Sequence, residues 1–467
     1  MHYEINRHIP GHIADILDAI VEADGETYIV GGAARDLLFN QDVVGKDLDI
    51  EVFGVDPDKL SGLLSQFGEV DQVGASFGVY IIKDIKFNSL PVEFAIPRAA
   101  ELLTGKKHTD FDVELDPNIT YECASLRRDL TINSIGIQWS TGEVIDPHGG
   151  IRDWKQKVAR EVDCNTFADD HLRTLRAAQF IARFGLDPHP SLVHIASMTE
   201  QNNLSKERIH AEWEKLLMKS KVPSAGIRFL SLCGWLPKYY PELFLQTGIR
   251  QEATWHPEGL AFDHTMEVVD AAARLRKSVP DDWQAPFMYG ALAHDCGKID
   301  HTFYHPEKEK IVSYNHAGSK LPEKLLHKIT GTKQVYDRAL WIVRRHMDKV
   351  GLSNSGKDKT FRKFVRKADS KWACWTIMHM FYIDDQTNGM EWTENGTMRL
   401  QMIRAMSHVY APGGVTLRKP VLSKTLMREL DLKPGPKVGK AIARANELFD
   451  LGYTHDKIIQ TLITEIK

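Results

Sequence analysis

Two aspartates separated by one residue, Asp47 and Asp49, have the types and spacing that most directly suggest chemistry in this 467-residue chain. Residues two apart on a strand point to the same face, so the two carboxylates would project together. Paired carboxylates can share Mg²⁺ ions, and the preceding Gly31-Gly32 pair can bring backbone amides close to a phosphate. This combination predicts the transfer of a nucleotidyl group from a nucleoside triphosphate.

Short strands and helices must position these groups. Apolar runs predict strands at residues 28–30 and 48–53, with a glycine turn and a short helix at 33–39 between them. Further strands are expected at 79–83, 92–96 and 132–137, and helical periodicity dominates after about residue 165. The sequence therefore predicts an α+β chain with a small mixed-sheet head, followed by helical regions.

The order of strand, Gly-Gly, Arg35-Asp36, strand and Asp-x-Asp resembles the head of the class II nucleotidyltransferases, the family of bacterial CCA-adding enzymes and poly(A) polymerases. Leu130, Ser134 and Asp169 stand where the family has Phe, Ala and Glu, and Gln179 replaces a frequent Arg. The further segments that carry the resemblance are 126–134 (LRRDLTINS), 145–150 (IDPHGG), 169–176 (DDHLRTLR) and 204–215 (LSKERIHAEWEK).

The resemblance implies roles for residues of the head. Asp47 and Asp49 would hold two Mg²⁺ ions, and Glu93 would be a third catalytic acidic residue. Asp36 is expected to cap or brace the turn and not to bind metal. The residues expected to bind the triphosphate, ribose and phosphates are Gly31, Gly32, Arg35, Arg127, Arg128, Asp129, Asn133 and Arg176.

Asp170 and Arg173 are expected to select the nucleobase. They lie three residues apart on a predicted helix and hence share a face. A carboxylate can accept from the exocyclic amine of cytosine or adenine, and a guanidinium can donate to the ring nitrogen, whereas uracil and guanine present the opposite pattern. The pair would select CTP and ATP without a nucleic-acid template. An intrahelical salt bridge is the alternative interpretation.

A second set of residues resembles the HD domain found in some bacterial CCA-adding enzymes. It contains 255–259 (WHPEG), 263–265 (DHT) and 292–298 (LAHDCGK), and His316 and His346 supply further histidines. Asp384 or Asp385 would close the set. The resemblance implies a divalent metal (Mg²⁺, Mn²⁺, Ni²⁺ or Co²⁺) and hydrolysis of 2′,3′-cyclic or 2′-phosphate RNA ends. The expected ligands are His264, His294, Asp295 and Asp384. A purely structural HD fold is the alternative.

The formal net charge of −4 is unevenly distributed. Residues 1–125 hold 9 Lys/Arg and 23 Asp/Glu, residues 318–372 hold 15 and 5, and residues 401–467 hold 11 and 6. An acidic, metal-binding head joined to basic helical regions fits a protein that binds a phosphate backbone away from its active site. An ordinary solvated surface on the basic helices is the alternative. In the tail, Lys437 and Lys440 follow a Pro-Gly-Pro turn that resembles the family's C-terminal segment, so they are expected to contact RNA. An ordinary loop–helix junction is the alternative.

The five cysteines are scattered and form no Cys-x-x-Cys pair, which predicts reduced thiols in a cytoplasmic protein. The sequence shows neither a signal peptide nor a run of about 20 apolar residues, so no membrane is expected, and no DNA partner is expected. Four domains are predicted: a head (1–150), a helical neck (151–245), an HD-type domain (246–400) and a helical tail (401–467).

The predicted function is addition or repair of the 3′-terminal CCA of tRNA from CTP and ATP, with HD phosphohydrolase activity. Three alternatives stay open at this point. The chain is a poly(A) polymerase of the same family, an HD metal phosphohydrolase whose head positions RNA, or a non-catalytic RNA-binding module.

Overall fold

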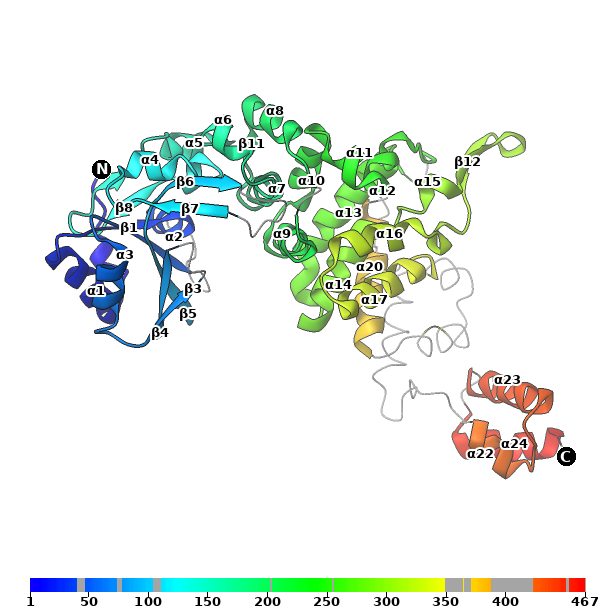
Figure 1. The fold of residues 1–467 in the computed structure, drawn as a ribbon. Helices are drawn as coiled ribbons and strands as arrows, with labels where there is room; N and C mark the ends of the chain where they lie inside the picture. The colour runs from blue at the N-terminus through cyan, green and yellow to red at the C-terminus, as the bar shows by residue number, and fades with distance from the viewer. Residues whose placement is uncertain are drawn as a thin grey trace. The chain divides into compact units, whose positions relative to one another are not determined.

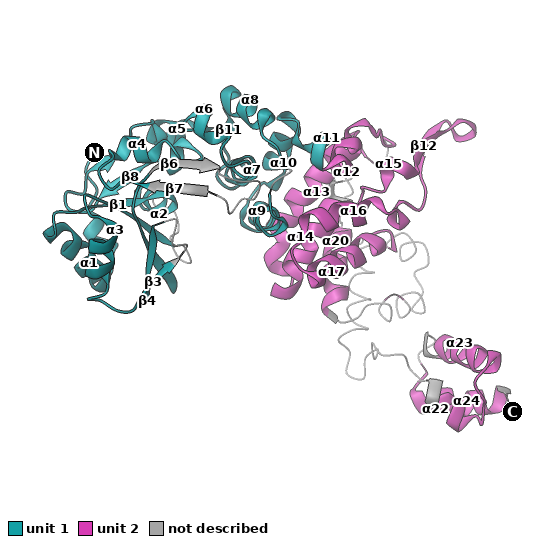
Figure 2. Cartoon of the chain, in the orientation of Figure 1, with its two compact units in different colours: residues 1–239 teal, residues 240–467 magenta. Residues whose placement is uncertain are grey.

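The computed structural model describes residues 1–39, 47–73, 78–103, 111–201, 204–253, 256–348, 364, 371–387, 423–450 and 453–466. The chain divides into two compact units, residues 1–239 and residues 240–467 (Figure 2). Trp255 of the predicted HD segment, Lys46 directly before Asp47, and most of the basic segment after residue 348 lie outside the described residues. The finer division into four domains stays a prediction.

A seven-stranded mixed sheet forms the head of the first unit, which confirms the predicted architecture (Figure 1). The strand order is β3-β4-β5-β2-β1-β8-β9; β2 and β5 are parallel and every other neighbouring pair is antiparallel. The strands are β1 (Glu26–Val30), β2 (Leu48–Phe53), β3 (Val70–Val73), β4 (Val79–Phe87), β5 (Leu90–Ala95), β8 (Gly136–Gln138) and β9 (Val144–Ile145).

Alternation along the central strands divides their side chains between two apolar clusters. Ile29 of β1 joins a large core with residues of α1 (Gly11–Glu22), α2 (Gly31–Leu38) and α3 (Pro57–Leu64). Tyr28 and Val30 point the other way and pack with Tyr121 of α4 (Tyr121–Ser125). This is the period-two pattern of a strand buried on both faces.

Strand register brings the predicted catalytic segments together. Asp49 on β2 lies opposite Val30 on β1 and beside Glu93 on β5. Because α2 begins at Gly31, directly after Val30, the glycine pair is placed next to the carboxylates.

The strand predicted at 132–137 is wrong in its first half. Thr131–Asn133 forms a 3-10 turn, and β8 starts only at Gly136. The turn is stabilised by local bonds, since Asn133 N–H donates to Leu130 O and the Ser134 hydroxyl donates to Thr131 O. These bonds compete with a sheet ladder.

The rest of the first unit is mainly helical. Gly226 lets α10 (Pro223–Leu232) approach α7 (Arg173–Phe184) closely, because a Cβ there would lie 2.3 Å from the Ala178 carbonyl oxygen. The elements are α5 (Gly150–Gln156), α6 (Cys164–Phe167), α7 (Arg173–Phe184), α8 (Pro190–Met198), α9 (Lys206–Lys219), α10 (Pro223–Leu232) and α11 (Trp235–Tyr239), with the strand pairs β6 (Arg98–Leu103) with β7 (Phe111–Leu115) and β10 (Val158–Ala159) with β11 (Asp187–Pro188).

The described residues of the second unit form a helical assembly with a hairpin between Thr302 and Ser313. Within the described residues, no helix combines the length and apolar character needed to cross a membrane. The elements of the second unit before its tail are α12 (Pro241–Phe244), α13 (Ala261–Leu275), α14 (Asp281–Ala293), α15 (Lys298–His301), β12 (Thr302–His305), β13 (Lys310–Ser313), α16 (Leu321–Ile329), α17 (Lys333–Arg345) and α20 (Lys371–Thr387). The tail helices α22 (Ser423–Glu429), α23 (Pro436–Asp450) and α24 (His455–Ile466) share a small apolar core of their own.

Candidate nucleotide pocket and candidate metal centre

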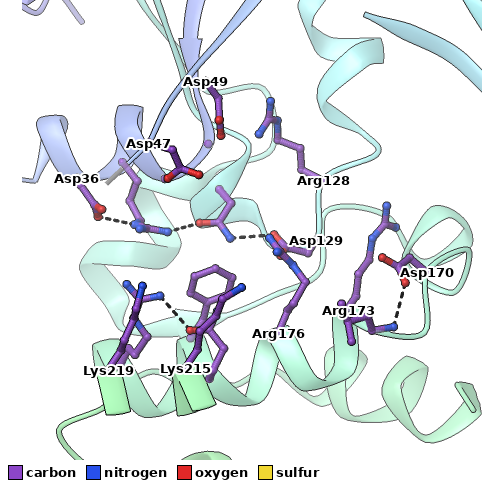
Figure 3. Close-up of a pocket in the computed structure, with 18 of the residues that line it drawn as sticks. Asp36, Asp47, Asp49, Arg128, Asp129, Asp170, Arg173, Arg176, Lys215 and Lys219 are labelled. Carbon is purple, nitrogen blue, oxygen red and sulfur yellow. Dashed lines mark hydrogen bonds and ion pairs between the residues drawn. The ribbon is translucent and has the colours of Figure 1, made fainter. Parts of the chain in front are cut away.

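A cavity of about 520 Å³ in the first unit gathers nearly all of the head and neck residues predicted from sequence (Figure 3). Among those predictions, Glu93 alone does not line it. The lining residues are Gly31, Gly32, Arg35, Asp36, Asp47, Asp49, Arg127, Arg128, Asp129, Asn133, Asp170, Leu172, Arg173, Arg176, Gln179, Phe180, Arg183, Arg208, Lys215 and Lys219.

Part of this pocket is a crowded acidic wall. Burial, followed by the neighbouring charge of Asp47, raises the pKa of Asp49 to about 6. Glu93 contributes from the adjacent strand, and its own pKa is raised by burial and by Asp47. A bound cation would reduce the electrostatic repulsion between these ionised carboxylates, and a donor set made only of oxygen atoms suits Mg²⁺. Asp47, Asp49 and Glu93 therefore fit a divalent metal site.

Gly31 occupies a position that excludes other residues. Its φ is +66°, and a Cβ would lie 2.9 Å from Nη1 of Arg128 and 3.4 Å from Oδ2 of Asp49. Arg128 is fixed by an ion pair with Glu51 at 2.6 Å. The turn thus needs glycine both for its backbone conformation and for the space occupied by Arg128. At Gly32 a Cβ would meet only Nη2 of Arg35, at 3.7 Å.

Five side chains form a continuous polar relay across the pocket (Figure 3). Arg35 Nε pairs with Asp36 at 2.8 Å, and Arg35 Nη1 donates to the Asn133 side-chain oxygen. Asn133 Nδ2 donates to Asp129 at 2.8 Å, and Arg176 Nε pairs with the other oxygen of Asp129 at 2.7 Å. Burial alone would raise the pKa of Asp129, but Arg176 and these hydrogen bonds lower that pKa to about 2. Asp36 thus holds the Arg35 guanidinium, and its expected role in the glycine turn stays a prediction.

Basic side chains form another part of the pocket lining, the basic wall, and the sequence analysis predicted only some of them. Arg183 of α7 lies in the pocket, and burial and then the nearby Arg35 lower its pKa. Lys215 and Lys219 of α9 line the same cavity, and Lys215 pairs with the buried Glu212 at 2.8 Å. Arg183 lies seven residues after Arg176, and Lys219 lies four residues after Lys215, so each shares a helix face with the earlier residue. This helical spacing is the sequence signal that could have identified the missed residues.

Asp170 and Arg173 both line the pocket but are not arranged as predicted. Helix α7 begins at Arg173, so Asp170 lies in the preceding turn, where its Oδ1 accepts from Leu172 N–H at 3.1 Å. Its Oδ2 pairs with Arg208 of α9 at 2.7 Å. The Arg173 guanidinium donates to the backbone carbonyls of Thr166 and Arg127. Their placement on one helix was therefore wrong, because the Asp170 carboxylate accepts from the Leu172 N–H in the turn before the helix; their role in base selection stays a prediction.

The second unit brings the predicted HD residues together in its interior. His264 lies on α13, Asp384 lies on α20, and His294 and Asp295 directly follow α14. His264 Nε2 is 3.1 Å from Asp384 Oδ1. All four side chains are buried, as are His316 and His346. The side chain of Asp385 lies outside the described residues, and Asp384 can serve as a ligand without it.

A smaller cavity of about 220 Å³ opens onto this cluster. Asp295, His316 and Asp384 line it, together with Lys298, whose Nζ is 2.7 Å from Asp295 Oδ2. Lys298 is the last residue of the predicted HD segment 292–298, and the sequence alone indicates no role for this lysine. A buried ammonium group beside candidate metal ligands can receive a phosphate oxygen.

The predicted RNA contacts of the tail belong to neither site. Lys437 and Lys440 are exposed on the first turns of α23, directly after Gly435. Contact with RNA at this helix start stays a prediction.

Comparison with known proteins identifies relatives of this chain. A family model described as "Poly A polymerase head domain" matches residues 27–160. The chain is 33% identical over 353 residues to the Multifunctional CCA protein of Aliivibrio salmonicida, covering 74% of this chain and 80% of that protein. It is 37% identical over 281 residues to the Multifunctional CCA protein of Mannheimia succiniciproducens, covering 58% and 63% respectively.

A solved structure extends the likeness over nearly the whole fold. The Thermotoga maritima CCA-adding enzyme complexed with tRNA has a TM-score of 0.61 and 16% identity, and the match covers 99% of this chain and 98% of that one. At this identity the match shows a shared fold. Together with 33% identity across four-fifths of the Aliivibrio protein, it means that this chain belongs to the family of multifunctional CCA proteins.

Proposed function

We propose that the chain adds or repairs the 3′-terminal CCA of tRNA, using CTP and ATP as donors and no nucleic-acid template. The observation that carries this proposal is that one pocket contains two groups of like charges, the carboxylates around Asp49 and the cations around Arg183. A metal-bound triphosphate would reduce the electrostatic repulsion within both groups, because its metal ions would neutralise the carboxylates and its phosphates would neutralise the cations. Its partners would be tRNA, CTP and ATP, and its compartment the cytoplasm.

The residues of the pocket would divide the work. Asp47 and Asp49, with Glu93 behind them, would hold Mg²⁺, as the family's divalent-metal dependence implies. When bound, the metal would increase the acidity of the RNA 3′-hydroxyl and neutralise the leaving pyrophosphate. The amides of Gly31 and Gly32 at the start of α2 would receive a phosphate. The polar relay would hold Arg35 and Arg176 in fixed orientations toward the nucleotide.

Base selection is proposed for the turn before α7. The Asp170 carboxylate is oriented by Leu172 N–H and Arg208, and Arg173 shapes the same turn through the Thr166 carbonyl. In this arrangement the Asp170 carboxylate would accept a hydrogen bond from the exocyclic amine of the base. Arg173 would give up its hydrogen bond to a backbone carbonyl and donate to the ring nitrogen of the base instead. We further propose that Lys437 and Lys440 contact the tRNA backbone.

The test is addition to a tRNA that lacks CCA, with CTP and ATP supplied separately and together. The proposal expects two C residues and one A, followed by a stop. Long A tails made from ATP alone, without dependence on tRNA, would contradict it and favour a poly(A) polymerase.

A second activity is proposed for the buried centre of the second unit, namely metal-dependent hydrolysis of 2′,3′-cyclic or 2′-phosphate RNA ends. Buried imidazoles and carboxylates lie beside a cavity that also contains Lys298. Release of inorganic phosphate or opening of 2′,3′-cyclic AMP, assayed with Mg²⁺, Mn²⁺, Ni²⁺ and Co²⁺, tests it. Lack of hydrolysis with all four ions would leave this centre a structural element.

A further inference from the structure

The hairpin of the second unit presents large aromatic side chains to solvent. Strands β12 and β13 form this hairpin, which projects from the helices of the unit (Figure 1). Phe303 is 51% exposed, Tyr304 is 58% exposed, and Tyr314, directly after β13, is 49% exposed. Single exposed apolar side chains are ordinary, but a group of aromatic rings on one short hairpin indicates a binding surface.

Strand pairing divides these rings between the two faces of the hairpin. Tyr304 lies directly opposite Ile311, and residues paired in this way share a face. Phe303 belongs to the other face, where its ring centre lies 5.8 Å from that of Tyr314. Among the described residues the Tyr304 ring contacts no other aromatic ring, so its surface is available to a ligand.

The face that carries Tyr304 also forms part of the cavity beside Lys298. Ile311 and Ser313 both line this cavity of about 220 Å³. The Cβ atoms of directly opposed residues lie about 4.5–5.5 Å apart, so the Tyr304 side chain starts next to the cavity lining although more than half of it remains in solvent. Tyr304 therefore lies at the rim of the cavity.

The cavity lining combines a polar part with an apolar part. Asp295, Lys298 and His316 supply the polar part, and Ile311 and the 38% exposed Met347 supply the apolar part. A phosphate group needs only hydrogen-bond donors and positive charge, whereas a nucleobase also has two flat faces that stack on aromatic and apolar groups. The lining thus favours a phosphate ester that carries a base.

The charges at the tip of the hairpin argue against a lipid surface as the occupant. Glu307, Lys308, Glu309 and Lys310 follow one another, and these two glutamates and two lysines sum to a formal charge of zero. Segments that bind anionic lipid carry an excess of Lys or Arg. Stacking on a base needs no such excess, because every base has a π-face.

We propose that Tyr304 is a base-stacking residue, and that the hairpin holds the terminal nucleotide of a single-stranded RNA end whose 2′-phosphate or 2′,3′-cyclic phosphate enters the cavity beside Lys298. The inference rests on the proposed phosphohydrolase function and adds a determinant of its substrate, namely the base. Because stacking tolerates all four bases, the terminal base would be required but not selected.

Photocrosslinking tests the stacking independently of hydrolysis. The full chain would be mixed with a short single-stranded RNA that ends in 5-iodouridine 2′-phosphate, irradiated, and digested for mass spectrometry. 5-Iodouracil forms crosslinks with aromatic rings that it contacts, so we expect a crosslink at Tyr304 that is lost in Tyr304→Ala. Phe303→Ala is the matched control, since Phe303 is an aromatic residue of similar exposure on the opposite face, and it should keep the crosslink.

Substrate preference gives a second readout. The preference for 2′-AMP over glycerol 2-phosphate, which lacks a base, would be measured as a ratio of kcat/KM values. Tyr304→Ala should reduce this ratio by about five- to a hundredfold, the value of one stacked base. Tyr304→Phe should preserve the ratio because it keeps the ring, and Phe303→Ala should not change it.

A crosslink map without Tyr304, or an unchanged preference in Tyr304→Ala, would overturn the stacking role. Self-association of the chain that disappears in Tyr304→Ala would also overturn it and assign this ring to a contact between two copies. If Tyr304→Ala fails to fold by circular dichroism, the crosslink map of the parent chain still decides. A crosslink at Tyr304 without phosphate release would leave the stacking role standing and reject the phosphohydrolase function, whereas phosphate release without the crosslink would do the reverse.

Discussion

The pocket of the first unit and the metal centre of the second handle charge in opposite ways. In the pocket, Asp47 is exposed, and the acidic and basic walls are each crowded with like charges. In the centre, all the candidate ligands are buried, and each carboxylate is already in contact with histidines or Lys298. Under the functions proposed above, the pocket would be completed by its metal-bound substrate, whereas the buried centre would be completed by ions held inside the unit.

The largest expected effect separates the two sites completely. Asp47→Ala or Asp49→Ala should reduce CCA addition by about a thousandfold or more, because metal ions supply several kcal/mol of transition-state stabilisation. Hydrolysis of 2′,3′-cyclic AMP should be unchanged in these variants and disappear in His294→Ala. Parallel assays of both activities on each variant measure this. Loss of both activities in every variant would show that the sites are not independent.

Metal removal should distinguish the two sites next. Dialysis against plain buffer should strip the pocket, where the Asp47 carboxylate is open to solvent, while the buried centre retains its ions. Adding Mg²⁺ afterwards should restore nucleotide addition fully. After EDTA treatment, hydrolysis should return with Mn²⁺, Co²⁺ or Ni²⁺ but not with Mg²⁺, because imidazole ligands favour transition metals. Restoration of hydrolysis by Mg²⁺ alone would contradict the assignment of resident transition-metal ions.

Nucleotide choice should respond to a single carboxylate. Asp170→Ala should raise relative use of UTP by roughly ten- to a hundredfold, the value of a lost charge-assisted hydrogen bond. Arg208→Ala is the control, since it removes the ion pair to Asp170 but leaves the carboxylate. Arg173→Ala should weaken CTP and ATP use together. Single-turnover rates with all four triphosphates on one tRNA measure the changes; unaltered selectivity in Asp170→Ala would mean that this turn does not read bases.

The glycine pair offers a sharper test of the pocket geometry. Gly31→Ala should lower nucleotide addition by roughly tenfold or more, because a left-handed alanine costs about 1–2 kcal/mol and its Cβ would displace Arg128. Gly32→Ala should have a smaller effect, since its Cβ meets nothing closer than 3.7 Å. Steady-state addition with saturating tRNA compares them. Equal losses would indicate that both glycines serve only as backbone donors.

The smallest expected effect is a pH-dependent change in the free energy of unfolding. The pKa of Asp129 is lowered to about 2 in the folded protein, so its stabilisation is fully present above the unfolded pKa of about 3.9 and is lost as pH falls through the folded pKa. Asp129→Asn should therefore destabilise the first unit by roughly 2 kcal/mol at neutral pH. Denaturation curves at decreasing pH should show this difference shrinking between about pH 4 and pH 2. A difference that does not depend on pH would mean that the Asp129 charge is not the stabilising feature.

The sequence predicted the mixed sheet, the β2 strand and the gathering of the glycine, aspartate and arginine motifs, because each follows from local periodicity and turn chemistry. It failed where side chains far apart in the chain compete for one partner. Asp170 pairs with Arg208, 38 residues away, and not with its near neighbour Arg173. The half-predicted strand at 132–137 failed because turn bonds at Thr131–Asn133 outweigh an apolar pattern. Similarly, His316 and His346 were expected from the sequence as further histidines, but only three-dimensional packing places both beside Asp295.

The polar relay from Asp36 to Arg176 has a consequence for how this protein can change over evolutionary time. Its five members come from three distant parts of the chain, and each inner member is bonded on both sides. Replacing Asn133 alone would leave both Arg35 and Asp129 short of a partner, at about 1–3 kcal/mol for each buried group. A lineage would therefore have to exchange several of these residues together, through intermediates less fit than either end. We expect aligned sequences of relatives to show the five positions either fixed or changing as a group.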